Sequence, residues 1–202
     1  SLGPAGGMVA ANDTGVGSVA WTNPTNAVSS NNSRATAALN NQTSNYLFVF
    51  NFGFSIPGNA TIDGVLVEIE RSRDAGTIRD NIVRLVRGGR IQANGDNKAT
   101  TTTWPLTASE DYASYGGAAD IWGFSSLTAQ DINDPLFGVI LSAIETASVA
   151  GTASVDHIRI TVTYTPGYDA APQVQEISTL YLGGRFYRLV PDERSKSGTV
   201  KE

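Results

Sequence analysis

Few side chains in this chain of 202 residues could do acid–base chemistry. There is no cysteine, and His157 is the single histidine. The alternation of residue types around it places His157 on the polar face of a strand and its neighbour Asp156 on the opposite face. A general base needs a carboxylate or a nucleophile beside it, so we expect His157 to be an ordinary solvent-exposed histidine.

Two pairs of carboxylates, Glu68 with Glu70 and Glu110 with Asp111, offer the residue types of a glycosidase acid and base. Glu68 and Glu70 fall on the outer face of one predicted strand, where carboxylates mainly keep a sheet soluble. The sequence contains no nucleophile elbow, phosphate-binding glycine loop or histidine-based metal spacing. It therefore predicts a protein that is not an enzyme.

Oxygen-bearing side chains gather at Asp131, Asn133 and Asp134, with Asp120 a short way before them. Calcium binds oxygens of this kind, but the spacing does not match an EF-hand loop. Acidic turns before a proline such as Pro135 are also common. We expect neither a metal nor another cofactor.

Four aromatic residues lie in or beside one long predicted loop. In a sugar-binding sandwich such residues form an exposed platform; in a structural sandwich, tryptophans close the open ends of the core. We favour the second interpretation, in which Trp21 also takes part, and keep the first as the alternative. The four residues are Trp104, Tyr112, Tyr115 and Trp122.

The elements that must position these side chains are strands. The clearest one runs from Val155 to Tyr164 and stops at Pro166-Gly167. Its alternation places Ile158, Ile160 and Val162 on a buried face, and Val155 and His157 on a solvated one. Such a half-buried strand, rich in β-branched residues, is typical of an antiparallel sheet.

The same alternation recurs along most of the chain. A short helix is predicted from Thr128, where Asp131 suits a capping box and Pro135 stops the helix. About eight strands in 150 residues without a long helix favour an all-β, jelly-roll-like antiparallel β-sandwich. The further predicted strands cover residues 19–21, 35–39, 46–54, 62–71, 78–87, a short stretch around Ile91, 98–104 and 137–144, and residues 105–126 are predicted as loop.

Three segments follow from this pattern: a flexible arm at 1–17, the sandwich at 18–166, and a linker, hairpin and tail for docking at 167–202. Gly183-Gly184 is expected to form a primed turn between two short strands. An isolated hairpin is marginal in water, so its larger side chains should pack on another surface. The predicted docking residues are Leu180, Leu182, Arg185, Phe186, Tyr187 and Leu189.

Charge and hydropathy narrow the classes of partner. The net charge of −5 argues against direct nucleic-acid binding. No apolar run approaches the roughly 20 residues of a membrane span. Seven basic and three acidic residues lie between positions 71 and 98. This local excess fits one solvated sheet face with its loops, or a docking patch for an acidic partner.

Several short motifs, spread over residues 18–165, resemble the jelly-roll modules of tailed-bacteriophage virion proteins, notably head decoration (cement) proteins. They are Ala20-Trp-Thr-Asn-Pro24, Phe52-Gly-Phe-Ser-Ile-Pro57, Ala60-Thr-Ile-Asp-Gly-Val65, Tyr115-Gly-Gly117, Asp120-Ile-Trp-Gly123, Leu127-Thr-Ala-Gln-Asp-Ile-Asn133 and the strand from Val155 to Tyr164. These motifs are turns and core strands, so they specify a fold better than a role.

The resemblance implies a non-enzymatic structural subunit, usually a homotrimer, on the outer surface of the capsid. Its partners would be further copies of itself and the major capsid protein or another virion protein. A protein that binds only the assembled lattice stabilises that lattice by mass action. The alternative function is a glycan- or receptor-binding module of a phage fibre or extracellular protein.

Overall fold

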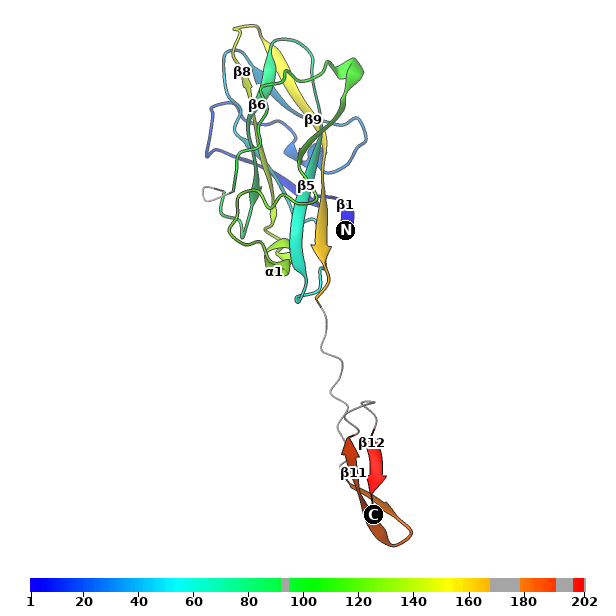
Figure 1. Ribbon diagram of the computed structural model, residues 1–202. Coiled ribbons are helices and arrows are strands. Elements are labelled where there is room, and N and C mark those ends of the chain that lie inside the picture. The colour runs from blue at the N-terminus through cyan, green and yellow to red at the C-terminus, as the bar shows by residue number, and fades with distance from the viewer. Residues whose placement is uncertain (92–94, 168–178, 192–197, 202) are drawn as a thin grey trace. The chain divides into compact units, whose positions relative to one another are not determined.

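The computed structural model describes residues 1–91, 95–167, 179–191 and 198–201 of the chain (Figure 1). It divides into two compact units, Ser1–Gly167 and Tyr168–Glu202. The first unit is a sandwich of two sheets in which the strands pair antiparallel. The all-β sandwich predicted from the alternation of residue types is therefore confirmed.

The first sheet has the order β1-β9-β5-β7, and β3 pairs with β9 beside β1. The second sheet has the order β2-β4-β8-β6. From β3 onward, successive strands alternate between the sheets, which gives the neighbours β3-β9-β5-β7 and β4-β8-β6 of a jelly roll. The strands are β1 (Leu2–Gly6), β2 (Val9–Asp13), β3 (Ala35–Leu39), β4 (Tyr46–Phe50), β5 (Thr61–Arg73), β6 (Ile78–Val86), β7 (Asp111–Gly116), β8 (Gly138–Glu145) and β9 (Gly151–Thr165).

The core lies between the two sheets and combines β-branched and leucine side chains with alanines and aromatic residues. Strand β4 is apolar on both faces, as expected for a central strand, and lies between β2 and β8. Leu47 and Val49 face the core, whereas Tyr46 and Phe48 join Ile140 in a second apolar cluster. The second sheet is therefore held by apolar packing on both of its faces.

The helices are short. Helix α1 (Ala129–Asn133) begins at Thr128, and the side chains of Thr128 and Asp131 form the predicted capping box. The 3₁₀ helices η1 (Pro24–Ala27) and η2 (Thr107–Ser109) lie in connections.

The prediction of a flexible arm at residues 1–17 is wrong. Strand β1 is the edge of the first sheet and β2 the edge of the second. The small residues of this segment allow close packing: a Cβ on Gly6 would lie 2.6 Å from His157 Nε2, and one on Gly7 would overlap Val49. Glycine here allows neighbouring side chains to pack closely against the backbone.

Some predicted boundaries also differ. Within residues 19–21 only Val19 forms a bridge, to Ser44, and the stretch around Ile91 is a turn. Part of the predicted loop, residues 111–116, is the edge strand β7. The segment 98–104 is not a named strand, yet Lys98 N donates to Val83 O at 2.9 Å and Trp104 N to Ile78 O at 2.8 Å, so it follows the free side of β6.

The second unit is a sheet of order β10-β11-β12, formed by Thr179–Leu182, Arg185–Pro191 and Gly198–Lys201. Gly183 and Gly184 have φ of 58° and 82°, as a primed two-residue turn requires. The predicted hairpin is confirmed. The frayed tail predicted for 191–202 is wrong where β12 pairs with β11. Among the described residues, no helix is long and apolar enough to span a membrane.

Candidate functional site

A β-bulge in β9 determines which side chains meet on the outer face of the first sheet. Glu70 of β5 pairs with His157 and Arg71 pairs with Val155, which leaves Asp156 as the extra residue. A bulge redirects side chains. Val155 is therefore buried rather than solvated, and Asp156 lies on the same side of the sheet as His157 instead of opposite it.

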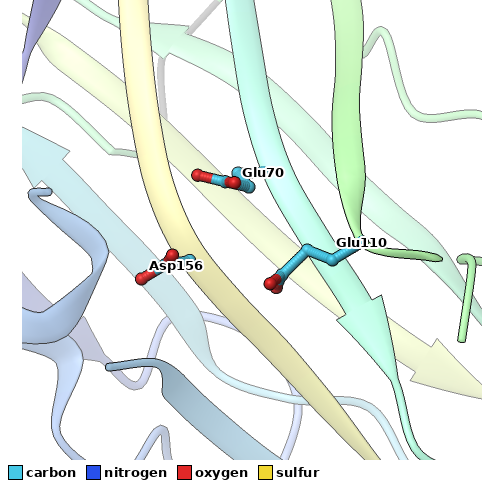
Figure 2. Close-up of side chains that lie close together, drawn as sticks. All are labelled: Glu70, Glu110 and Asp156. Carbon is cyan, nitrogen blue, oxygen red and sulfur yellow. The ribbon is translucent and has the colours of Figure 1, made fainter. Parts of the chain in front are cut away.

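Three carboxylates converge on this face (Figure 2): Glu70 from β5, Asp156 from the bulge and Glu110 from the residue before β7. One oxygen of each lies within 4.8 Å of one oxygen of the other two. We refer to Glu70, Glu110 and Asp156 as the carboxylate cluster. The cluster brings together residues that are 40 and 46 positions apart in the sequence, so local spacing could not reveal it.

Asp156 is almost fully buried, with 1% of its surface exposed. Its carboxylate accepts hydrogen bonds from Asn32 N at 2.9 Å and from Asn31 N at 3.2 and 3.3 Å. A buried carboxylate needs such donors, because burying its charge without hydrogen bonds would cost several kcal/mol. Asp156 thereby fastens the loop around residues 29–33 to the sheet.

Glu110 is paired with Arg34. The guanidinium Nε donates to Oε1 at 2.9 Å and to Oε2 at 3.0 Å, and Nη2 also donates to Oε2. It also accepts a hydrogen bond from Ser72 Oγ at 3.0 Å. The hydrogen bond from Arg34 is the main cause that holds the pKa of Glu110 below its usual range. Glu110 is thus kept ionised, whereas the general acid of a glycosidase needs a raised pKa.

Next to the cluster, His157 is half-buried rather than solvent-exposed, and burial lowers its pKa. Its Nδ1 lies 2.9 Å from the Tyr112 hydroxyl. The Arg159 guanidinium lies 3.9 Å from the centroid of the Tyr112 ring and donates to both oxygens of Glu68 at 2.9 and 3.0 Å. Glu68 and Glu70 are therefore parts of a network, not isolated solubilising charges.

A hard cation at the carboxylate cluster would compete with groups already bound there. The oxygens of Asp156 receive backbone N–H groups, and those of Glu110 receive Arg34 and Ser72. Glu70 Oε2 is the one buried carboxylate oxygen without a hydrogen-bond partner in the described part of the chain. The cluster is built as a tie between loop and sheet.

The alternative of an exposed aromatic platform is not what the structure shows. Trp104, Tyr115 and Trp122 are 1%, 3% and 0% exposed, and Tyr112 is half-buried. Trp122 Nε1 donates to Val65 O at 2.8 Å inside the core. All three tryptophans, Trp21 included, are buried core residues, which agrees with the favoured interpretation as far as burial goes.

A buried ion pair that the sequence did not indicate lies between the sheets. Arg71 Nη1 donates to Asp80 Oδ1, and their side chains are 5% and 0% exposed. Asp80 Oδ1 also accepts Trp104 Nε1 at 2.8 Å, and Asp80 Oδ2 accepts the Tyr115 hydroxyl at 3.0 Å. Burial is the main cause that raises the pKa of Tyr115, so the phenol stays a donor.

Three of the seven basic residues between 71 and 98 are engaged within the fold. Arg71 is inside the core, Arg73 Nε donates to Trp104 O at 2.9 Å, and Lys98 Nζ pairs with Asp120 at 2.8 Å. These three side chains are held by partners within the sandwich, so they are not free charges of a docking patch.

The oxygen-rich segment considered for calcium is engaged in local structure. Asp131 caps α1, Asn133 exchanges two hydrogen bonds of 2.8 Å with the backbone of Ile56, and Asp134 accepts Leu136 N at 2.8 Å. These residues act as caps and turn formers.

The predicted docking residues occupy β10 and β11. Directly paired positions share a face of the sheet. The register therefore assigns Leu180, Leu182, Arg185, Tyr187 and Leu189 to one face and Phe186 to the other. Val200 of β12, opposite Leu189, extends the first face and was not predicted.

Comparisons with known proteins name no family for this chain: no family model and no curated protein matches it. A solved fragment comprising domains C and D of a Bacteroides protein matches with a TM-score of 0.41 and 13% sequence identity. The match covers 76% of this chain and 66% of that fragment, so the chain spans slightly less than two thirds of it. A likeness this remote carries no argument about function.

Proposed function

We propose that this chain is a non-enzymatic virion structural protein, a decoration or cement subunit that binds the assembled head lattice and associates with itself. The motif resemblance to jelly-roll virion modules supports the proposal, and the jelly-roll sandwich is consistent with it. The observation that carries the proposal is the second compact unit, a sheet of three strands in a segment of 35 residues.

This second unit is too small to stabilise itself. Chains below about 40 residues usually need disulfides, metals or oligomerisation. The segment has no cysteine and no histidine, so a disulfide and the common thiolate or imidazole metal sites are not open to it. In this proposal the second unit is stabilised by burial against another chain.

The register gives the second unit two chemically different faces. The register places Leu180, Leu182, Tyr187, Leu189 and Val200, together with Arg185 beside the turn, on one face, which we call the leucine-rich face and propose as an interface. The other face pairs Tyr181 with Phe186 and places Arg188 directly opposite Lys201. Like charges in that position are unfavourable unless an acidic group compensates them.

In this proposal the leucine-rich face serves self-association, and the pair Arg188 and Lys201 binds an acidic site on a partner such as a capsid protein. In this proposal the sandwich is the body displayed on the shell. Several chains joined through the second unit would bind a repetitive lattice more tightly than one chain does, because each further contact forms within the same assembly.

Co-sedimentation with bacteriophage heads tests the proposal. The full chain is expected to pellet with assembled heads and to stay in solution with unassembled capsid subunits. A chain ending at Pro166 is expected to stay in solution with both. Equal binding of the two proteins to heads, or binding by neither, would contradict the proposed role of the second unit.

A further inference from the structure

Strand β7 is an edge of the first sheet with one open side. It pairs with β5 along one side, and the described ranges of the chain place no strand along the other. Three other edges of the sandwich differ. Residues 98–104 follow β6, and Thr22 exchanges two backbone hydrogen bonds, of 2.8 and 3.0 Å, with Thr36 of β3. Strand β1 contains Pro4, which has no N–H.

Two hydrogen bonds show which backbone groups of β7 face the open side. Residues along an antiparallel strand alternately direct their N–H and C=O groups toward the paired strand and away from it. Gly117 N donates to Val65 O of β5 at 3.1 Å, whereas Tyr112 N donates to Asp111 Oδ1 at 2.7 Å. Every second residue from Tyr112 to Gly116 therefore directs its N–H and C=O away from β5.

These backbone groups form an unpaired row. Tyr112 C=O, both groups of Ser114 and Gly116 N–H have no hydrogen-bond partner among residues that the structure describes, and Ser114 and Gly116 are exposed. Strand β7 carries neither proline nor lysine, which often blunt such an edge. Donors and acceptors that alternate at the spacing of a strand are a template for another extended backbone.

The side chains of an added strand would find room beside this edge. A pocket of about 350 Å³ is lined by Asp111 and Ala113 of β7 and by Thr102, Thr103 and Ser109 from the segment before β7. Successive side chains of a strand point to opposite faces, so every second side chain of the added strand would point toward this pocket. Its hydroxyl-bearing lining suits small side chains such as threonine or valine.

Charge distinguishes between extended partners. Asp111 is exposed and has no ion pair with any residue that the structure describes. The first 167 residues carry a net charge of −5. A second sandwich at this edge would add negative charge to negative charge, whereas a basic segment complements it.

We propose that β7 binds an extended, basic peptide segment of a partner protein, which joins the first sheet as a further strand. Backbone hydrogen bonds to Tyr112, Ser114 and Gly116 hold the segment, and a lysine or arginine beside Asp111 favours it over neutral segments. This site lies on the sandwich and depends neither on the second unit nor on the proposed virion role.

Titration of the full ¹⁵N-labelled chain with a synthetic peptide tests the site. The probe is the acetylated and amidated peptide Lys-Thr-Val-Thr-Val-Thr-Lys. It is expected to shift the amide signals of Ser114 and Gly116 in a saturable way and to slow their hydrogen exchange, because both amides gain an acceptor. The amides of Ala113 and Tyr115, which face β5, should exchange as before.

A modified probe separates backbone pairing from side-chain contacts on the unaltered protein. The same peptide N-methylated at its third to fifth residues keeps its side chains but loses donors along both of its edges. It should bind more weakly by about fivefold or more, the value of one neutral hydrogen bond.

Variants of the protein test the same pairing from the other side. Ser114→Pro removes an N–H of the unpaired row, and proline is tolerated where an edge strand faces solvent. It should weaken binding of the probe by about fivefold or more. Ser114→Ala, the matched control, keeps the N–H and should bind as the unaltered chain does. Asp111→Asn keeps an acceptor for Tyr112 N and should weaken binding about threefold, as for an exposed ion pair.

Four results would overturn the proposal. They are the absence of shifts at Ser114 and Gly116, equal binding of the methylated and unmethylated peptides, equal binding by Ser114→Pro and Ser114→Ala, and tighter binding of a probe with glutamate in place of lysine. Protection of the Ser114 amide that rises with protein concentration without peptide would also overturn it, because a second copy would then occupy the edge.

Discussion

Asp80 shows how one side chain can organise the space between two sheets. It neutralises Arg71, which is almost fully buried, and accepts donors from two core aromatics. We predict that Asp80→Ala lowers the free energy of unfolding by about 3–5 kcal/mol, because it leaves an uncompensated buried charge. Urea unfolding followed by tryptophan fluorescence measures this change.

Asp63→Ala is the matched control for that prediction. Asp63 is half-exposed and bonds the exposed Thr165 hydroxyl, so its loss should change stability by less than about 0.5 kcal/mol. Similar effects of the two substitutions would show that Asp80 does not have the compensating role assigned to it.

Asp156 gives a second prediction, about a loop. Its carboxylate accepts the amides of Asn31 and Asn32. Asp156→Ala should cost about 1–3 kcal/mol, the penalty for leaving buried donors without an acceptor. Hydrogen exchange should also become faster at the Asn31 and Asn32 amides than at the paired amides of β5. Unchanged exchange at both loop amides would contradict the assigned tie.

The pairing of Arg34 with Glu110 gives a prediction about pH. The pKa of Glu110 is lower in the folded than in the unfolded chain, chiefly because Arg34 hydrogen-bonds it. Its contribution to stability is therefore present above its ordinary pKa of 4.5 and is lost as pH falls through the folded value. Arg34→Met should lower stability at pH 7 and make it fall less steeply between about pH 5 and 2.

Urea midpoints measured across this pH range for both proteins check the Arg34 prediction. The two curves should converge toward acid pH. Parallel curves would mean that Glu110 does not titrate as the pair requires.

At the scale of elements, the strands were predictable where apolar residues alternate with polar ones. Ile158, Ile160 and Val162 were assigned to the core correctly because nothing interrupts the period between them. The cap of α1 was also found, since the Thr128–Asp131 motif depends only on local chemistry.

The bulge at Asp156 could not be predicted from the alternation of apolar and polar residues. One extra residue exchanges the faces of the residues before it, and the composition of the strand gives no sign of this. For the same reason the carboxylate cluster and the half-burial of His157 were missed. Strand β7 was missed because Asp111 to Gly116 carries no β-branched residue and owes its form to pairing with β5.

Strands β1 and β2 give the prediction that belongs to this scale. Each completes the edge of one sheet, so deleting residues 1–13 should expose the apolar core along one side of the sandwich. We expect a clear fall in melting temperature, seen by near-ultraviolet circular dichroism. A chain ending at Pro166 is the control, and its sandwich should melt at the same temperature as that of the full chain. An unchanged melting temperature after deletion of residues 1–13 would instead support a flexible arm.

At the scale of the whole molecule, the two compact units differ in charge as well as size. The first 167 residues contain nine basic and fourteen acidic residues, a net charge of −5, whereas the remaining segment has five of each. The sandwich should repel its copies, while the second unit has no net charge to oppose association. Association between copies is therefore expected through the second unit.

The most direct test of this account is the solution mass of two proteins, measured by light scattering on a sizing column. The account predicts an oligomer, with a trimer as the expected size, for the full chain of 21.3 kDa and a monomer for a chain ending at Pro166. A monomer in both cases, or the same oligomer in both, would contradict the claim that the second unit joins this protein to its copies.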